Sequence, residues 1–323
     1  MLDGFGRTID YLRISVTDRC DLRCVYCMPE GGVAALRHGE ILRYEEIVRL
    51  ARVMTRLGVR HVRLTGGEPM TRRGCLGLVR ALRALPDVES VAMTSNGILL
   101  RGLVAEARAA GLDALNLSLD TLDPDAYARM TRGGDLDAVL QTLREAVAAG
   151  LNVKVNAVPV RGFNEDALVP LAALARDMPI RVRFIELMPL GCARGLRGVP
   201  TGEVVARLTE AFGALSPDET AYGHGPANYV KPDGFTGSIG LIGAVSDEFC
   251  AACNRVRLTA DGRLKLCLNH TRGLDLRALL RGGADDGELE AAIRAAVADK
   301  PECHGFAASI CDRETRRMNE IGG

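Results

Sequence analysis

Strand-like and helix-like segments alternate along the first 190 residues, and this alternation constrains the fold more than any other feature. Short β-branched segments predict strands at residues 11–16, 59–65, 88–94, 114–119, 152–158 and 180–187. Segments between them predict helices at 44–57, 76–85, 103–110, 136–149 and 165–176. Repeated β–α–β units connect right-handedly into a parallel sheet. Six units are too few for a closed eight-stranded barrel. We therefore predict an α/β fold, an open, partial parallel β/α barrel rather than a flat doubly wound sheet.

Most of the predicted strands carry one polar face. Polar and apolar side chains alternate through them, with Arg13, Arg63 and Lys154 on the polar side. Parallel strands that are covered on both faces are almost wholly apolar. We therefore expect helices over the apolar faces and a polar interior lumen, whose cations suit an anionic ligand. The last strand leaves its register open, because Arg181 and Arg183 fall out of phase with the polar residues after them.

Three cysteines lie in one short loop directly after the first predicted strand. Cys20, Cys24 and Cys27 have the spacing C-x3-C-x2-C. A closed structural zinc site takes four ligands, whereas a [4Fe–4S] cluster has four irons to bind. Three thiolates can hold three irons and leave the fourth open to a small molecule. The alternative, loop cysteines without a metal, is disfavoured by their density.

Turn sequences follow the other predicted strands. GGEP at 66–69 follows the second, TSNG at 94–97 follows the third, and the fourth ends at Ser118. Ligand sites in such folds lie at the carboxyl ends of the strands. Paired glycines allow the backbone to approach a ligand closely, although a plain turn is the alternative explanation.

Composition excludes several classes of protein. The formal net charge is +0, so no global field attracts nucleic acid or an anionic membrane. Residues 1–8 lack the apolar core of a secretory signal, and charges interrupt every apolar run before it could span a bilayer. We expect a cytoplasmic protein whose cysteines are metal ligands or buried thiols. Four cysteines do not belong to any closely spaced group in the sequence, and we assign them structural roles by default: Cys75, Cys192, Cys303 and Cys311.

Glycine, proline and short polar segments dominate beyond about residue 195, so we predict two domains, 1–190 and 191–323. The second is expected to be smaller and to cover the open side of the barrel. It contains a second set of cysteines, Cys250, Cys253 and Cys267, and a hairpin turn at 261–262 folds the third back beside the first two.

The second set of cysteines is compatible with two kinds of metal site, zinc and iron–sulfur. His270 could complete a Cys3His zinc site, and the spacing alone does not separate zinc from iron–sulfur. Arg255 and Arg257, on one face of the adjoining strand, favour the cluster, because zinc bound purely for structure has no need of paired guanidiniums.

These motifs together resemble those of one enzyme family. They are the first cysteine loop with Tyr26 directly before Cys27, GGEP, TSNG, C-x2-C-N-R-x-R with a third cysteine after 13 intervening residues, and a terminal Gly-Gly. This pattern resembles the GTP 3′,8-cyclase family of radical S-adenosylmethionine enzymes, which act first in molybdenum cofactor biosynthesis. The match covers nearly the whole chain. A departure is His61, where the family tends to carry a more basic residue.

The resemblance implies roles for individual residues. One [4Fe–4S] cluster, which generates the radical, is expected on Cys20, Cys24 and Cys27, and an auxiliary [4Fe–4S] cluster on Cys250, Cys253 and Cys267. S-adenosylmethionine is expected to contact Tyr26, Gly67, Ser118 and Met188. GTP is expected to contact Arg13, Arg63, Thr94, Lys154, Arg255, Val256 and Arg257. Catalytic roles are implied for Arg255, Arg257, Gly322 and Gly323.

The implied reaction converts GTP to (8S)-3′,8-cyclo-7,8-dihydroguanosine 5′-triphosphate. The resemblance also implies an external electron donor, a downstream cyclic pyranopterin monophosphate synthase and, as one option, a homodimer. An alternative is a radical S-adenosylmethionine enzyme that modifies peptides, which typically carries more C-terminal cysteines. A non-catalytic zinc- or iron-binding scaffold is the alternative from another class, and it does not explain a polar lumen.

Overall fold

The computed structural model describes residues 1–247, 249–306 and 313–322. Its strands are β1 Tyr11–Ser15, β2 His61–Thr65, β3 Ser90–Ser95, β4 Ala114–Ser118, β5 Asn152–Ala157, β6 Arg181–Ile185, β7 Leu215–Pro217, β8 Asn228–Pro232, β9 Ser238–Ile242, β10 Arg255–Leu258, β11 Arg263–Lys265 and β12 Gly273–Asp275. Its α-helices are α1 Tyr44–Arg56, α2 Cys75–Arg83, α3 Val104–Ala109, α4 Pro124–Thr131, α5 Leu136–Ala148, α6 Leu168–Asp177, α7 Thr201–Phe212, α8 Leu276–Arg281, α9 Asp286–Ala298 and α10 Met318–Ile321. Short 3₁₀ helices are η1 His38–Glu40, η2 Pro69–Thr71, η3 Glu165–Ala167, η4 Gly191–Gly195 and η5 Cys250–Ala252.

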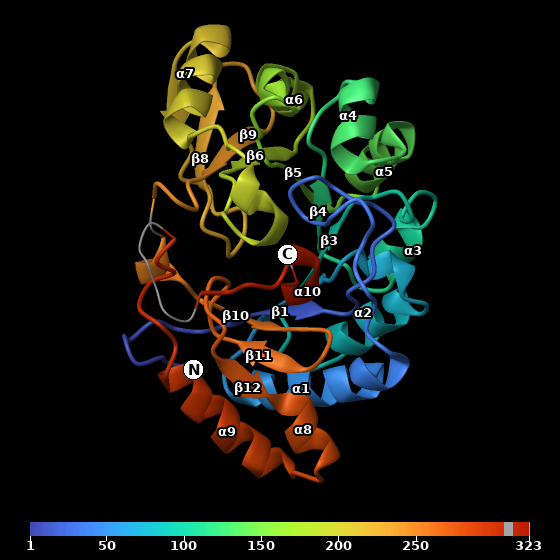
Figure 1. Cartoon of the computed structure of the whole chain (residues 1–323). Coiled ribbons are helices and arrows are strands. Elements are labelled where there is room, and N and C mark those ends of the chain that lie inside the picture. The colour runs from blue at the N-terminus through green and yellow to red at the C-terminus, as the bar shows by residue number, and fades with distance from the viewer. Residues whose placement is uncertain (248, 307–312, 323) are drawn as a thin grey trace.

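The strands form one sheet in the order β12-β11-β10-β1-β2-β3-β4-β5-β6-β9-β8-β7. Neighbours from β10 to β9 pair in parallel, while β11, β12, β8 and β7 pair antiparallel at the two ends. The sheet is curved but not closed, which confirms the predicted partial barrel (Figure 1).

The chain beyond residue 190 adds strands to both edges of this barrel. β10 pairs with β1, and β9 pairs with β6. The outer edges of β1 and β6 would otherwise present unpaired backbone groups, which folded proteins cover or pair. In Figure 1 the orange β10–β12 lie beside the blue β1, and the second cysteine set is thereby carried next to the first strand.

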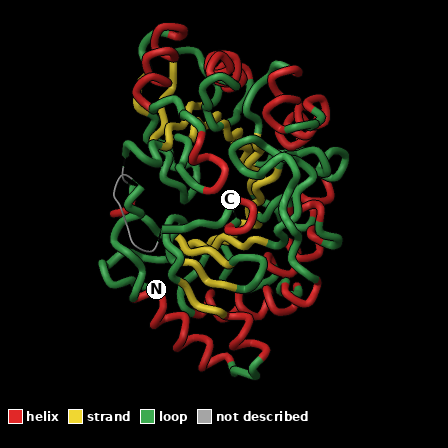
Figure 2. Tube along the Cα trace, viewed as in Figure 1, coloured by secondary structure: helices red, strands yellow, loops and turns green. Residues whose placement is uncertain are grey.

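Side chains alternate across the strands as the sequence predicts. Leu12 and Ile14 of β1 and Leu64 of β2 are fully buried in the core beneath the outer helices. Figure 2 shows those helices along the outer side of the sheet. The opposite faces carry the polar residues into the lumen. β6 follows the same rule, because Val182 and Phe184 join the core and the strand ends at Ile185.

No helix among the described residues is both long and apolar enough to cross a membrane.

Candidate active site

One pocket lies inside the partial barrel, walled by the polar faces of β1 to β6 and by β10. Its wall contains many of the residues that the sequence singled out: Arg13, Tyr26, Arg63, Thr94, Ser118, Met188, Cys250, Cys253, Arg255, Arg257 and Cys267. The structure therefore brings most of the candidate contacts for S-adenosylmethionine and for GTP to a single cavity, although Gly67, Lys154 and Val256 are not part of its wall.

The first cysteine loop follows β1 and is shaped by its own backbone. The amide of Cys27 donates to the carbonyl of Cys24 at 2.9 Å, and the amide of Leu22 donates to Sγ of Cys20 at 3.4 Å. The guanidinium of Arg23 donates to the carbonyls of Cys20 and Leu22 at 2.7 and 2.8 Å. These bonds fix the loop that presents the three thiols.

The three thiols form a donor set that fits an iron–sulfur cluster. Burial raises the pKa of Cys20 and of Cys27 to about 12, and it raises the pKa of Cys24 well above its ordinary value. The thiols are close enough that the charge of one raises the pKa of another. Without a metal they are neutral, and metal binding would release their protons. Soft thiolates screened from water are the ligands that iron–sulfur clusters take.

Tyr26 connects this loop to the pocket wall. Its hydroxyl donates to Oδ2 of Asp120 at 2.9 Å. Burial raises the pKa of Asp120 to about 6, and its Oδ1 accepts from the amide of Val158 at 2.8 Å. Ser118, the last residue of β4, and Met188, just after β6, line the same pocket. Three of the four predicted contacts for S-adenosylmethionine thus lie around one cavity.

The fourth, Gly67, packs against the chain that leads into the cysteine loop. A Cβ on Gly67 would come within 2.2 Å of the carbonyl oxygen of Arg19. A Cβ on Gly66, whose φ is +157°, would come within 2.5 Å of the carbonyl oxygen of Thr17. The two glycines therefore let the turn after β2 support the segment just before Cys20.

The second cysteine set lines the pocket from the C-terminal side. Cys250 and Cys253 belong to η5 and its end, and Cys267 follows β11. Burial raises the pKa of Cys250 to about 11. Burial would also raise that of Cys253, but the charges of Lys300 and Arg255 outweigh it, so that its pKa is lowered. The set combines soft donors with nearby cations, which suits an anionic metal–thiolate group.

His270, the fourth ligand of the zinc alternative, has a backbone neighbour in this structure. Nε2 of His270 lies 3.2 Å from the carbonyl oxygen of Cys303. Within residues 1–247, 249–306 and 313–322, no group of three His, Cys, Asp or Glu side chains is arranged to hold a single metal ion. In a cubane each thiolate binds its own iron, so the cysteines need not converge on one point. The second set is therefore compatible with a cluster.

Guanidinium groups lie side by side across the lumen. In the register of the sheet, Arg13 of β1 is opposite Arg63 of β2 on one side and opposite Arg257 of β10 on the other. Like charges directly opposite each other destabilise a sheet. Burial, and then the charges of Arg257 and Arg63, lowers the pKa of Arg13. A bound polyanion would relieve this repulsion, so the arrangement fits a polyphosphate.

Two further cations belong to this group. Lys154 of β5 is buried, and burial followed by the charges of Arg183 and Arg63 lowers its pKa to about 7. Arg183 of β6 lines the pocket. The sequence analysis missed Arg183 as a ligand, because the strand was expected to extend two residues beyond its actual end and its alternation was obscured.

Among the polar atoms of the pocket wall, Thr94 Oγ1, Asn116 Oδ1 and Arg255 Nε are buried without a hydrogen-bond partner in the described part of the chain. An unsatisfied buried polar group costs about 1–3 kcal/mol. A ligand that pairs with these atoms would recover that free energy. Asn116 was missed by the sequence analysis, although it occupies the same face of β4 as Ser118.

The remaining predicted residues lie elsewhere. Val256 is fully buried in the core on the outer face of β10, so only its backbone could approach a nucleotide. Gly322 lies at the ends of β1 and β2, where a Cβ would come within 3.0 Å of Cβ of Ser15 and 3.2 Å of Oγ1 of Thr65. Gly323 lies outside the described residues.

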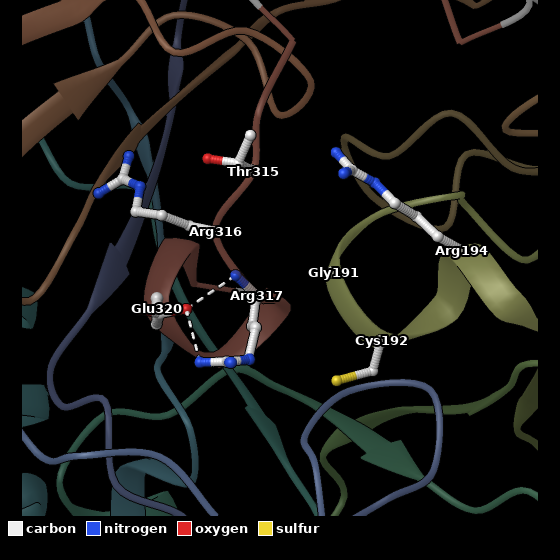
Figure 3. A pocket seen from close by; sticks show the side chains of 7 residues that line it. All are labelled: Gly191, Cys192, Arg194, Thr315, Arg316, Arg317 and Glu320. Atoms are coloured by element: carbon white, nitrogen blue, oxygen red, sulfur yellow. Dashed lines mark hydrogen bonds and ion pairs between the residues drawn. The ribbon is translucent and has the colours of Figure 1, made fainter.

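A second hollow lies between η4 and the C-terminal segment (Figure 3). It is lined by Gly191, Cys192, Arg194, Thr315, Arg316, Arg317 and Glu320. The Cys192 thiol raises the pKa of Cys27, so this hollow adjoins the first cysteine set. Of the other isolated cysteines, Cys75 is buried in α2, Cys303 is exposed, and Cys311 lies outside the described residues.

Comparisons with known proteins agree with this architecture. Residues 14–175 match the family model described as "Radical SAM superfamily", and residues 180–306 match "Molybdenum Cofactor Synthesis C". The chain is 47% identical to a GTP 3′,8-cyclase of Pelotomaculum thermopropionicum and 46% identical to one of Moorella thermoacetica, in each case over 100% of both chains.

Solved structures support the fold. The crystal structure of Streptococcus suis SuiB bound to S-adenosylmethionine superimposes with a TM-score of 0.64 at 17% identity, covering 89% of this chain and 68% of that one. Sequence motifs, sheet topology and full-length similarity therefore agree, and the chain belongs to the GTP 3′,8-cyclase family of the radical S-adenosylmethionine superfamily.

Proposed function

We propose that this chain converts GTP into (8S)-3′,8-cyclo-7,8-dihydroguanosine 5′-triphosphate, the first step of molybdenum cofactor biosynthesis. The observation that carries the proposal is the single pocket that has cations on β1, β2, β6 and β10 and the second cysteine set in its wall. The cations on β6 and β10, Arg183 and Arg257, are buried. Full-length relatives that bear the name GTP 3′,8-cyclase support it.

As a member of the superfamily, the chain uses S-adenosylmethionine and an iron–sulfur cluster. We assign that cluster to Cys20, Cys24 and Cys27, and an auxiliary [4Fe–4S] cluster to Cys250, Cys253 and Cys267. When bound, the first cluster and S-adenosylmethionine supply a 5′-deoxyadenosyl radical that removes a hydrogen atom from the substrate. Tyr26, Gly67, Ser118 and Met188 are the proposed contacts for S-adenosylmethionine.

The protein's own residues bind and orient the nucleotide. Arg13, Arg63 and Lys154 hold the triphosphate through charge-assisted hydrogen bonds. Thr94 Oγ1 and Arg255 Nε, buried and unpaired in the described part of the chain, supply directed contacts that set the position of the ribose and base. Such positioning matters because a misplacement of ~1 Å can cost about 100-fold in rate.

The C-terminal segment closes the pocket over the reacting groups. Met318, the first residue of α10, lines the pocket, and the carbonyl oxygen of Gly322 accepts from Arg257. Arg255, Arg257, Gly322 and Gly323 are therefore proposed to act at the reacting end of the nucleotide, where they orient the substrate and exclude water.

The proposal extends to the protein's surroundings. The reaction needs an external electron donor, and the product is proposed to pass to a cyclic pyranopterin monophosphate synthase in the cytoplasm. The division into a barrel domain, 1–190, and a cluster- and substrate-binding domain, 191–323, is also proposed.

The test is anaerobic incubation of the purified protein with GTP, S-adenosylmethionine and a strong reductant. Hydrogen removed from ribose C3′ is replaced by one added to the guanine, so the expected product has the mass of GTP but a different chromatographic retention. Iron content of about eight atoms per chain with broad brown absorbance is expected for two cubane clusters. An iron-loaded protein that forms 5′-deoxyadenosine but leaves GTP unchanged would overturn the assigned substrate.

A further inference from the structure

A short segment between β7 and β8 crosses the end of the lumen at which the barrel strands begin. We call residues 222–226 the strap. The carbonyl oxygen of Tyr222 accepts from Nζ of Lys154 and from Nδ2 of Asn152, the latter at 3.5 Å. Gly225 and Pro226 line the pocket from this side. The strap therefore forms the floor of the cavity, opposite the end at which the cysteine loop lies.

The strap rests on the cations that are proposed to bind phosphate. A Cβ on Gly223 would lie 2.7 Å from Nζ of Lys154, and one on Gly225 would lie 3.8 Å from Nη1 of Arg183. Gly223 has a φ of +133°, a conformation that side chains disfavour. Glycine at this position allows the strap backbone to press directly against the ammonium group.

A stack of two imidazoles holds the middle of the strap. The rings of His224 and His61 lie 3.3 Å apart between centroids and are inclined by 14°. His61, the first residue of β2, is buried, and its Nδ1 lies 3.0 Å from Oγ of Ser90. Tyr11 contacts both imidazoles edge-on, with centroids 6.3 and 6.4 Å away. His224 itself is exposed, so this contact lies on the outer surface of the floor. We call the stacking of His224 on His61 the latch.

The start of the strap has a separate anchor. The guanidinium of Arg181 lies 4.0 Å from the centroid of the Tyr222 ring. The hydroxyl of Tyr222 donates to Oδ2 of Asp218 at 2.6 Å. Loss of the latch would therefore release residues 223–225 while Tyr222 stays in place.

We propose that the strap sets the length of the phosphate chain that the lumen accepts, and that the stacking of His224 on His61 holds it in position. This inference rests on the proposed function, because it takes the nucleotide triphosphate to lie along Arg63, Lys154 and Arg183. A phosphate beyond the third meets the Tyr222 carbonyl oxygen and the backbone of Gly223. With the latch removed, a longer chain passes out between the strap and β2.

The test compares binding of GTP and guanosine 5′-tetraphosphate to the wild-type holoenzyme and to His224→Ala. Wild type is expected to bind GTP more tightly than guanosine 5′-tetraphosphate. The variant is expected to reduce that preference about tenfold, equivalent to about 1.4 kcal/mol, mainly by binding the tetraphosphate more tightly. His38→Ala, the same substitution at an exposed histidine of η1, is the matched control and should keep the wild-type preference.

Two further measurements separate the outcomes. Hydrogen exchange of the amides at 223–225 should be faster in His224→Ala than in wild type, which shows that the latch has been released. Inorganic tripolyphosphate and tetrapolyphosphate should show the same change in preference without a nucleotide. Faster exchange with unchanged preference for both pairs of ligands would overturn the role of the strap. Failure of wild type to bind GTP, with the inorganic preference intact, would instead count against the proposed function.

Discussion

Nη1 of Arg257 donates a hydrogen bond of 2.6 Å to the carbonyl oxygen of Gly322. Arg257 lies on β10, in the pocket wall, and Gly322 ends α10 with a left-handed φ of +74°. The bond joins a residue expected to bind substrate to the terminal segment expected to assist catalysis. Because Gly322 also packs against Ser15 and Thr65, the end of α10 reaches the carboxyl ends of β1 and β2, where the radical is expected to form.

Removal of residues 322 and 323 is expected to abolish cyclisation while folding and iron content remain those of wild type, because two glycines have no side chains to bury and Ile321, which is buried in the core, is kept. Gly322→Ala should also lower activity, since a Cβ would press on Ser15 in a backbone conformation that favours glycine. Activity, melting temperature and iron content are the measurements. Gly283→Ala is the matched control, because Gly283 has a φ of +91° and its Cβ would meet nothing within 4 Å. Full cyclisation by the truncated protein would exclude the role of the terminal segment.

Glu314→Ala is expected to lower the free energy of unfolding by about 3–5 kcal/mol. The Glu314 carboxylate pairs with Nζ of Lys265, and both side chains are almost completely buried. Burial would raise the pKa of Glu314, but hydrogen bonds from Arg316 and Lys265 outweigh it and lower the pKa to about 2. The stability from this pairing is therefore present above the ordinary glutamate pKa and is lost as the pH falls towards 2.

Urea unfolding of wild type and Glu314→Ala at neutral pH measures this loss. Glu210→Ala, on the exposed side of α7, is the control and should change stability by less than about 0.5 kcal/mol. A similarly small change in the free energy of unfolding for Glu314→Ala would show that the ion pair between Lys265 and Glu314 does not stabilise the fold.

Arg183→Ala is expected to weaken GTP binding roughly 10- to 100-fold, the equivalent of one lost charge-assisted hydrogen bond of about 1.5–3 kcal/mol. Guanosine binding should change little, because Arg183 acts on the phosphates. Its Nε and Nη2 donate to Oδ1 of Asn156 at 2.8 and 2.6 Å, which fixes the guanidinium in the pocket. Calorimetry with both ligands is the measurement, and the exposed Arg176→Ala is the control. Equal losses for GTP and guanosine would place Arg183 away from the phosphates.

Lys154 should make GTP affinity depend on pH. Burial and neighbouring guanidiniums lower its pKa to about 7, so its positive charge is present below pH 7 and is lost as the pH rises through 7. Relative to Lys154→Arg, which keeps its charge, wild type should lose up to about fivefold in affinity between pH 7 and pH 8, as the charged fraction of Lys154 falls. Taking the ratio of the two proteins cancels the titration of the phosphates themselves. Parallel pH profiles would mean that Lys154 is charged throughout or does not contact the ligand.

Local signals in the sequence predicted much of the barrel and of its lumen. Alternation placed Arg13 and Arg63 on the inner face, and the helix α1 begins at Tyr44 as predicted. α4 was missed even though Asp123 caps it, with its side chain accepting from the amide of Ala126, and Pro124 occupies the first helical turn. Asp123 followed by Pro124 is a helix-start signal that lies within the local sequence.

Other features depend on contacts between distant segments. The pairing of β10 with β1 joins residues more than 240 positions apart, and no local pattern specifies it. The position of the strap also depends on distant contacts. A Gly- and Pro-rich segment predicts a loop, but it does not indicate that Gly223 packs against Lys154. Cys20, Cys24 and Cys27 were easier to find, because their chemistry and their spacing lie within one short loop.

The central claim is a division of labour between the two cysteine sets, and paired serine variants test it most directly. 5′-Deoxyadenosine and cyclised nucleotide are measured together by chromatography for Cys24→Ser and Cys267→Ser under strong reductant. Cys24→Ser should form neither compound. Cys267→Ser should still form some 5′-deoxyadenosine but no cyclised nucleotide, because the first cysteine loop is intact and the substrate has lost its second site. Normal cyclisation by Cys267→Ser would contradict the account.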